Sequence, residues 1–238
     1  MDALTGSAEN TITFDLEAVG LREVNRTLHA MVGVTPGTTI RIERPDGRHS
    51  VAAGLDAPLQ VIIAGHVGYY AAGMNQQAEL KIEGSAGTGL AENMMSGRVE
   101  VAGNVSQSAG ATAHGGLLVV HGDAGARCGI SMKGVDIVIG GDVGHLSAFM
   151  AQAGRLVVRG DAGEALGDSI YEARLYVRGT VASLGADCVE KPMTDEHRRE
   201  LGELLVAAGY PDDDLDDYTR YGSARSLYHF HPDHAGAY

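Results

Sequence analysis

Residues 117–129 read LLVVHGDAGARCG, and residues 155–167 repeat them closely as RLVVRGDAGEALG. In both stretches a short apolar run leads into a glycine turn, which is also how phosphate-binding loops begin. The first glycine of GDAG belongs to a longer pattern, because equal steps along the chain in either direction reach a glycine each time. The seven structural repeat glycines, spaced at a constant interval of 19, are Gly65, Gly84, Gly103, Gly122, Gly141, Gly160 and Gly179. The decisive question is therefore what a repeat of this length folds into.

The residues around each repeat glycine follow a second pattern. Aliphatic side chains stand two and four residues before it, from Val61 and Ile63 in the first unit to Leu175 and Val177 in the last, with mixed residues between them. This alternation is typical of a half-buried strand. Two residues after the glycine, valine and alanine alternate from unit to unit, which would let the inward side chains of stacked units interdigitate.

A unit of this length with one strand cannot bury its own apolar face, so successive units must stack. No helical periodicity of 3.6 is visible within the unit, and the leucine and asparagine ladder of leucine-rich repeats is absent. The sequence therefore predicts an all-β fold, a single-stranded parallel β-helix of about seven coils over residues 59–192, with right-handed winding. The repeat glycines would occupy corners where a positive φ or close packing excludes a side chain.

The two ends lack the repeat. Within residues 1–58, NTITFDL and GTTIRIERPDGRHSVAAG predict strands, the second with a turn at 45–47, and Leu21, Val24, Leu28 and Met31 mark one face of a helix. We expect this segment to form a small α+β cap on the first coil. Residues 193–238 begin with a predicted helix, TDEHRRELGELLVAAG, that has Thr194 or Asp195 as N-cap and Gly209 as terminator. This helix would cap the last coil, and the stretch after it would be an extended docking tail.

Charge and composition narrow the class of function. The formal net charge is −13, which argues against nucleic-acid and anionic-membrane partners. The chain opens on polar residues without a signal-peptide pattern and has no apolar run near the ~20 residues of a spanning helix, so a cytoplasmic location is expected. Its two cysteines, Cys128 and Cys188, lie three coils apart, about 14 Å, beyond the roughly 7 Å limit of a disulfide. Both are predicted to be free thiols.

Candidate chemistry is sparse. No helix and no GKS or GKT motif follow the GDAG turns, so we interpret them as architecture rather than as phosphate sites. Asp123, Asp142 and Asp161 share one repeat position and should stack about 4.8 Å apart; we expect them to hydrogen-bond their own turns, with a bound cation as the alternative. The histidine cluster of the tail, His229, His231 and His234 with Asp233, offers metal ligands but no second cluster to complete a shell. His66, His114, His121 and His145 fall at different repeat positions and are expected at the surface. No catalytic, cofactor-binding or metal-binding residue is predicted in this chain.

The repeat, in GGLLVVHGDAG, AGRLVVRGDAG and SGRVEVAGNVS, resembles the glycine-repeat (GXGXG) β-helix domain of the glutamate synthase large subunit. In that family the domain is similar in having seven coils and no catalytic residue, and it orients the glutaminase and FMN domains. The same module forms a subunit of formylmethanofuran dehydrogenase. The ends, FDLEAVGLREVNRTLH at 14–29 and RYGSARSLYHFHPDHAGAY at 220–238, resemble the stand-alone glycine-repeat subunit of methylamine–glutamate N-methyltransferase, also called N-methylglutamate synthase.

The resemblance implies a scaffold subunit without its own active site. It would bridge a class II amidotransferase-like subunit and an FMN/iron–sulfur subunit, and both FMN and the cluster would reside in the partner. Two alternatives stay open: a docking subunit like the glycine-repeat chain of formylmethanofuran dehydrogenase/formyltransferase, and a stand-alone enzyme that uses the aspartates or the tail histidines. Residues expected to contact a partner lie near the C-terminus: Arg220, Tyr221, Arg225, Tyr228, His229 and His231.

Overall fold

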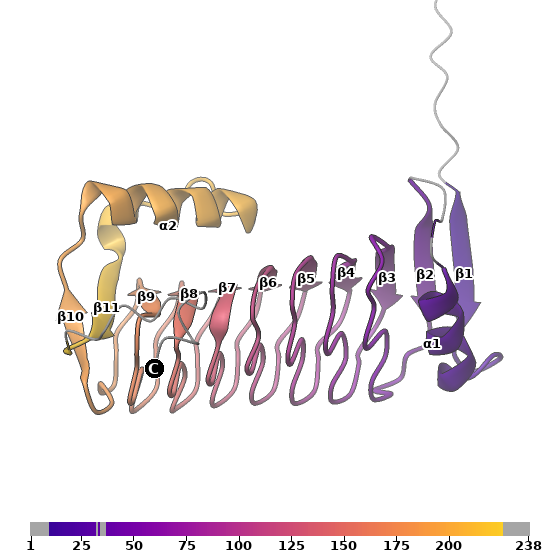
Figure 1. The fold of residues 1–238 in the computed structure, drawn as a ribbon, viewed down its shortest axis with the longest axis horizontal. Helices are drawn as coiled ribbons and strands as arrows, with labels where there is room; N and C mark the ends of the chain where they lie inside the picture. The colour runs from indigo at the N-terminus through magenta and orange to yellow at the C-terminus, as the bar shows by residue number, and fades with distance from the viewer. Residues whose placement is uncertain (1–9, 32, 34–36, 226–238) are drawn as a thin grey trace, which may run out of the picture.

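The protein is an elongated parallel β-solenoid, described here from a computed structural model (Figure 1). The structure describes residues 10–31, 33 and 37–225. Seven strands stack along the long axis, and each of the first six pairs in parallel with the strand one repeat later. They are β3 (Gln60–Ala64), β4 (Glu79–Ile82), β5 (Arg98–Val101), β6 (Leu117–Val120), β7 (Lys133–Ile139), β8 (Ala153–Val158) and β9 (Arg174–Val177). The predicted parallel β-helix of about seven coils is confirmed.

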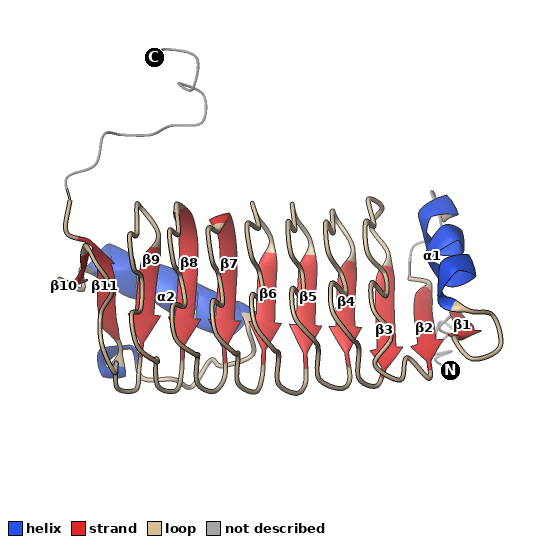
Figure 2. Cartoon of the chain, turned by 90° about the horizontal axis from the view of Figure 1, so that it is seen from below, coloured by secondary structure: helices blue, strands red, loops and turns tan. Residues whose placement is uncertain are grey.

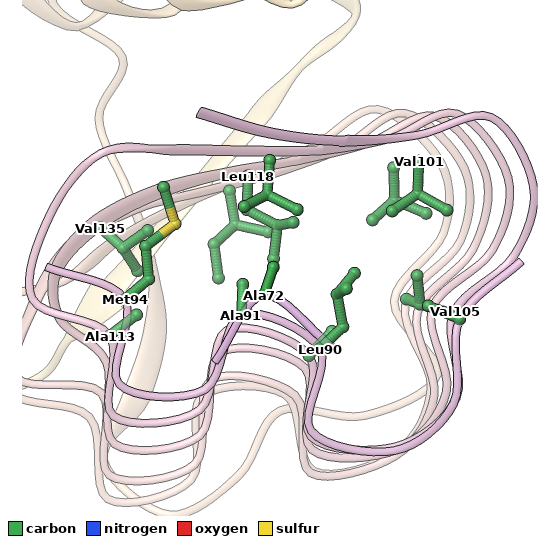
Figure 3. Close-up of a cluster of buried hydrophobic side chains, with 14 of the residues drawn as sticks. Ala72, Leu90, Ala91, Met94, Val101, Val105, Ala113, Leu118 and Val135 are labelled. Carbon is green, nitrogen blue, oxygen red and sulfur yellow. The ribbon is translucent and has the colours of Figure 1, made fainter. Parts of the chain in front are cut away.

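The interior is a continuous column of small and branched side chains (Figure 3). The alternating valine and alanine residues predicted from the repeat face one another across coils, as parallel bridges that run from Val67 to Ala86, Val105 and onward to Val181. Val67 and Ala86 are 4% and 6% exposed. Because a valine in this column always faces an alanine in the next coil, the coils can approach at strand spacing there without overpacking.

The tight turns of each coil place many residues in the left-handed region. In each coil three alternate residues have a positive φ; in one coil they are Gly89 (φ 71°), Ala91 (φ 53°) and Asn93 (φ 56°). Most of these residues are not glycine, whereas six of the seven repeat glycines have no positive φ. Close packing, not backbone conformation, is therefore the reason for the repeat glycines.

The N-terminal segment continues the sheet. β1 (Thr11–Asp15) pairs in parallel with β2 (Thr39–Glu43), which pairs in parallel with β3. The turns after β2 hydrogen-bond those of the first repeat coil, as in Gly47 N to His66 O at 2.9 Å and Gly54 N to Gly73 O at 2.7 Å. Residues 39–59 thus form a further coil with extra residues, so the boundary predicted at residue 58 falls inside the solenoid. Helix α1 (Leu21–Ala30) links β1 to β2 and buries Val24 and Leu28, as its apolar face predicted.

The C-terminal segment departs most from expectation. Strand β11 (Thr219–Ser223) lies antiparallel between β9 and β10 (Cys188–Lys191), so residues expected in an extended tail are part of the sheet. Helix α2 (Asp195–Ala207) begins at the predicted N-cap, Thr194. It does not cap the last coil: it runs back along the outer face of the sheet, over β6–β9 (Figures 1 and 2). A short 3-10 helix, η1 (Leu215–Asp217), connects α2 to β11. No helix among the described residues is long and apolar enough to cross a membrane.

Candidate interaction surface

The corner that follows each strand is held by a polar ladder between coils. The Asp123 carboxylate accepts the N–H of Asp142 at 2.9 Å, and Asp142 accepts the N–H of Asp161 at 2.7 Å. The same bond is made at the other coils by His66, Ser85, Asn104 and Asp161, which accept from Ser85, Asn104, Asp123 and Thr180. The expectation that these residues bond their own turns is wrong, since each bonds the next coil. Hydrogen bonds from Thr180 hold the pKa of Asp161 below its usual range.

The repeat glycines make room for this ladder. A Cβ at Gly122 would overlap the Asn104 side chain, and one at Gly141 would overlap the carboxylate of Asp123. Gly103, Gly160 and Gly179 stand in the same relation to Ser85, Asp142 and Asp161, while at Gly84 the overlap is with the backbone of Gly65. Gly65, the first of the seven, is the exception with a positive φ of 144°. Glycine and polar acceptor are therefore a coupled pair at five of the seven corners, those of Gly103, Gly122, Gly141, Gly160 and Gly179.

The nucleophilic and metal-ligating side chains in the described residues are not gathered into a site. Cys128 and Cys188 are both free, as predicted; both are also buried, and burial raises their pKa values to about 12 and about 11. A thiol with so high a pKa is a poor nucleophile at neutral pH. No group of three or more His, Cys, Asp and Glu residues in the described part of the chain is placed to hold a metal ion.

Helix α2 covers an apolar strip on the outer face of the sheet. Its Leu201, Leu204 and Leu205 pack on four side chains that share one outward register position in β6–β9: Val119, Val138, Val157 and Tyr176. The same position in β2–β5 holds Arg41, Ile62, Lys81 and Glu100. Three of these four residues are charged, whereas all four beneath the helix are apolar or aromatic. This change along one column was visible in the sequence, and it is the signal that could have located the helix.

Ion pairs fix the segment after α2. The guanidinium of Arg159 makes two hydrogen bonds to Asp213, at 2.6 and 2.7 Å, and lies 3.8 Å from the centre of the Tyr210 ring. The Tyr210 hydroxyl is 2.7 Å from His121 Nδ1, over Gly140, where a Cβ would crowd it. Tyr218 also donates to Asp213, at 2.7 Å. The hydrogen bonds from Arg159, and after them that from Tyr218, hold the pKa of Asp213 below its usual range.

The outer face over β2–β5 is left open beside the end of α2. A cavity of about 230 Å³ lies on it, lined by polar and charged side chains that include Gln60, Glu79, Lys81 and Arg98. Arg98 marks its border, because it donates to the Ala207 carbonyl at the C-terminal end of α2 and pairs with Glu100 at 2.8 Å. The hollow is shallow and its lining carries both charges, so it is part of an accessible face rather than an enclosed pocket.

Three of the residues expected to dock a partner lie in the described part of the chain. Arg220 and Tyr221 are in β11: Arg220 donates to the Pro192 carbonyl at 3.1 Å, and Tyr221 is partly buried against the core. Arg225 follows the strand and pairs with Asp187 at 2.5 Å. Tyr228, His229 and His231, like His234 of the tail cluster, lie outside the described residues. The structure thus brings the first three to the C-terminal end of the solenoid.

These features define the class of the protein as a glycine-repeat β-solenoid in which the corner polar groups bind the coils to one another. No protein-family model matches the chain. Protein GlxC of Rhizobium meliloti (strain 1021) is 56% identical to it over 224 residues, which cover 94% of this chain and 98% of that protein. The chain belongs to the GlxC family.

Proposed function

We propose that the chain is the scaffold subunit of a glutamate synthase-like complex, most specifically of methylamine–glutamate N-methyltransferase. In this role it bridges an amidotransferase-like subunit and an FMN/iron–sulfur subunit and holds them at a fixed separation. The glutamate synthase relation rests on the resemblance of the repeat and of the two chain ends. The observation that carries the scaffold role is the unbroken stack of coils from β2 to β9, about 34 Å of rigid spacer at a strand spacing of about 4.8 Å.

The hydrogen bonds and ion pairs made by the polar side chains support this role. The corner aspartates, which a stand-alone enzyme would need, use their carboxylates to accept backbone N–H groups of the next coil. Arg159 and Arg174, which belong to the coils beside α2, are paired with Asp213 and Glu200 respectively. The aspartates stabilise the stacking of the coils and the arginine pairs hold the α2 segment on the sheet, so both serve the rigidity of a spacer.

The iron–sulfur cluster expected in the complex does not fit this chain. Such clusters are held by cysteine thiolates, four in the common types. The chain has two cysteines, and burial raises the pKa of both thiols, which disfavours the thiolate that a cluster requires. We therefore assign the cluster, and with it FMN, to the partner subunit.

Purification of the tagged chain from its native host tests the proposal. We expect two further chains to be retained, identified by mass spectrometry as amidotransferase-like and FMN/iron–sulfur proteins, and flavin absorbance in the complex alone. The complex should form N-methylglutamate from methylamine and glutamate with release of ammonia. An assay with isotope-labelled ammonia in place of methylamine tests the choice of amine, because exchange of ammonia into glutamate is seen only through the label. Turnover by the isolated chain, or retention of neither class of partner, would contradict the scaffold role.

The docking residues are tested by a truncation. Removal of residues 226–238, which include Tyr228, His229 and His231, should leave the circular dichroism of the chain unchanged and weaken retention of one partner. A charge reversal at Arg225, which pairs with Asp187 at the same end, should act in the same direction. Full retention of both partners by both variants would remove these residues from the interface.

A further inference from the structure

Two outward columns form a ridge where the turns of each coil meet the following strand. They flank an inward column that includes Met94 and Ala113, whose side chains point into the core (Figure 3). Backbone bonds hold the ridge in register from coil to coil, as in Met95 N to Asn75 O and Tyr171 N to Ala151 O, both at 2.8 Å. The columns read Met74, Asn93, Thr112, Ser131, Met150, Ser169 and Gln76, Met95, His114, Lys133, Gln152, Tyr171.

Large apolar side chains occupy only four of these twelve positions, and all four are well exposed. Met74 and Met95 are 46% and 45% exposed, and Met150 and Tyr171 are 39% and 44% exposed. Met74 and Met95 lie in consecutive coils, and Met150 and Tyr171 occupy the same two positions four coils later, about 19 Å along the axis. The ridge therefore presents two equivalent apolar pairs with polar residues between them.

We propose that this ridge is the interface of a two-fold symmetric dimer, with a second copy of this chain as the partner. A two-fold axis midway between the pairs, perpendicular to the solenoid, sets the copies antiparallel. It brings Met95 of each copy next to Met150 of the other, and Met74 next to Tyr171. Equal pairs at equal distances from one axis are what an isologous interface requires, and methionine and tyrosine are enriched in interface cores.

The charges along the ridge are compatible with this pairing, although the net charge of the chain is −13. Neither of the two columns contains a carboxylate. In the antiparallel arrangement Glu172 comes beside Gln76 and Gln77 of the other copy, whose amides can donate to it, and the coils of Glu92 and Glu172 do not meet. Six coils give a strip about 24 Å long. Because the strip is only two columns wide, the area that it buries should be at the low end for specific interfaces, and the dimer should dissociate on dilution.

Engineered cysteines test the arrangement directly on the full-length chain. The double variant Met95→Cys, Met150→Cys should form a disulfide-linked dimer on mild oxidation, seen on a non-reducing gel. Within one copy the two thiols are three coils apart, about 14 Å, too far to bond each other. The single variants are the matched controls, because the axis keeps identical positions about 14 Å apart, and neither should cross-link. The natural cysteines are buried and do not interfere.

Sedimentation over a concentration series gives a second measurement that needs no cross-link. The unmodified chain should dimerise reversibly, and Met95→Glu should weaken the dimer roughly tenfold or more, since carboxylates would enter the apolar contact. Val206→Glu, at an exposed site on α2 away from the ridge, should leave dimerisation unchanged. A chain that stays monomeric at every concentration, or single cysteine variants that cross-link as well as the double variant, would overturn the proposal. The proposal is also overturned if the isolated chain is monomeric and Met95→Glu releases another subunit from the native complex, because the ridge would then bind that subunit. The dimer does not depend on the proposed function.

Discussion

At Gly141 a single methyl group would occupy the place of the Asp123 oxygen that accepts the Asp142 N–H. The residue requirement at the five corners from Gly103 to Gly179 is thus a pair: an acceptor in one coil and a missing side chain in the next. The sequence predicted the glycines and the polar column separately. It did not predict their coupling, because a constant interval along the chain does not say whether a side chain bonds its own turn or its neighbour.

Gly141→Ala should therefore destabilise the protein by about 1–3 kcal/mol, through overpacking and the lost hydrogen bond. Urea unfolding followed by circular dichroism measures the change. Gly202→Ala is the matched control, since a Cβ at this position in α2 makes only an ordinary 3.4 Å contact with Leu215. Alanine favours a helix interior, so this variant should be stabilised by up to about 1 kcal/mol. Equal destabilisation by both variants would contradict the coupling.

The two ends of helix α2 were predictable from its local sequence, but its position on the sheet was not. Its start at Thr194 and its end before Gly209 followed from capping residues, and both are confirmed. Its place on the sheet did not follow, because the apolar residues it covers alternate with core residues and resemble an ordinary buried strand. The strand β11 was missed for a related reason: TRYGS is short and polar, and it enters the sheet only by pairing with β9 and β10.

Val138→Asp should detach α2 while the coils stay folded. The substitution places an unpaired carboxylate beneath the helix. Burying that charge costs several kcal/mol, which exceeds the free energy that the packing of α2 at this point contributes. Hydrogen exchange should rise in residues 195–207 and remain slow in β3–β5. Lys81→Asp, at the same register position on the open face, should change neither region. Loss of protection throughout the solenoid in Val138→Asp would show that α2 and the coils unfold as one unit.

The contact between Arg159 and Asp213 should make the α2 segment sensitive to acid. Because the pKa of Asp213 is lower in the folded chain than its ordinary 3.8, its ion pair adds stability above that value and loses it as the pH falls through the lowered pKa. Asp213→Asn should cost about 1–3 kcal/mol at neutral pH, since it removes a charged hydrogen bond that is largely shielded from water. The difference from the unmodified chain should shrink on acidification, as measured by urea unfolding at a series of pH values. A difference that is constant with pH would contradict the assignment.

Across the whole molecule the alternation of valine and alanine doubles the period of one column of the core. The repeat of the backbone is one coil, but the repeat of this column is two, because Val67, Val105 and Val143 each face alanines. This part of the fold was predictable from the sequence, since both the corner glycines and the alternation are periodic. The extra coil of residues 39–59 was not, because its added residues break the constant interval of 19.

Removal of two coils should therefore be tolerated better than removal of one. Deletion of residues 72–109 joins Val67 to Ala124 and keeps the alternation, whereas deletion of residues 72–90 joins Val67 to Val105. Thermal unfolding should show the shorter deletion to be the less stable variant. Both shorten the spacer, by about 10 Å and about 5 Å, so both should impair assembly of the proposed complex. A two-coil deletion less stable than the one-coil deletion would contradict the doubled period.

The corner ladder also has a direction. Each acceptor side chain belongs to the earlier coil and each donor N–H to the later one, from His66 through to Thr180. During synthesis the earlier coil leaves the ribosome first, so every newly emerged coil meets an acceptor already in place. The solenoid is thus suited to build itself from the N-terminus as the chain lengthens, with α2 closing over its last strands when translation ends.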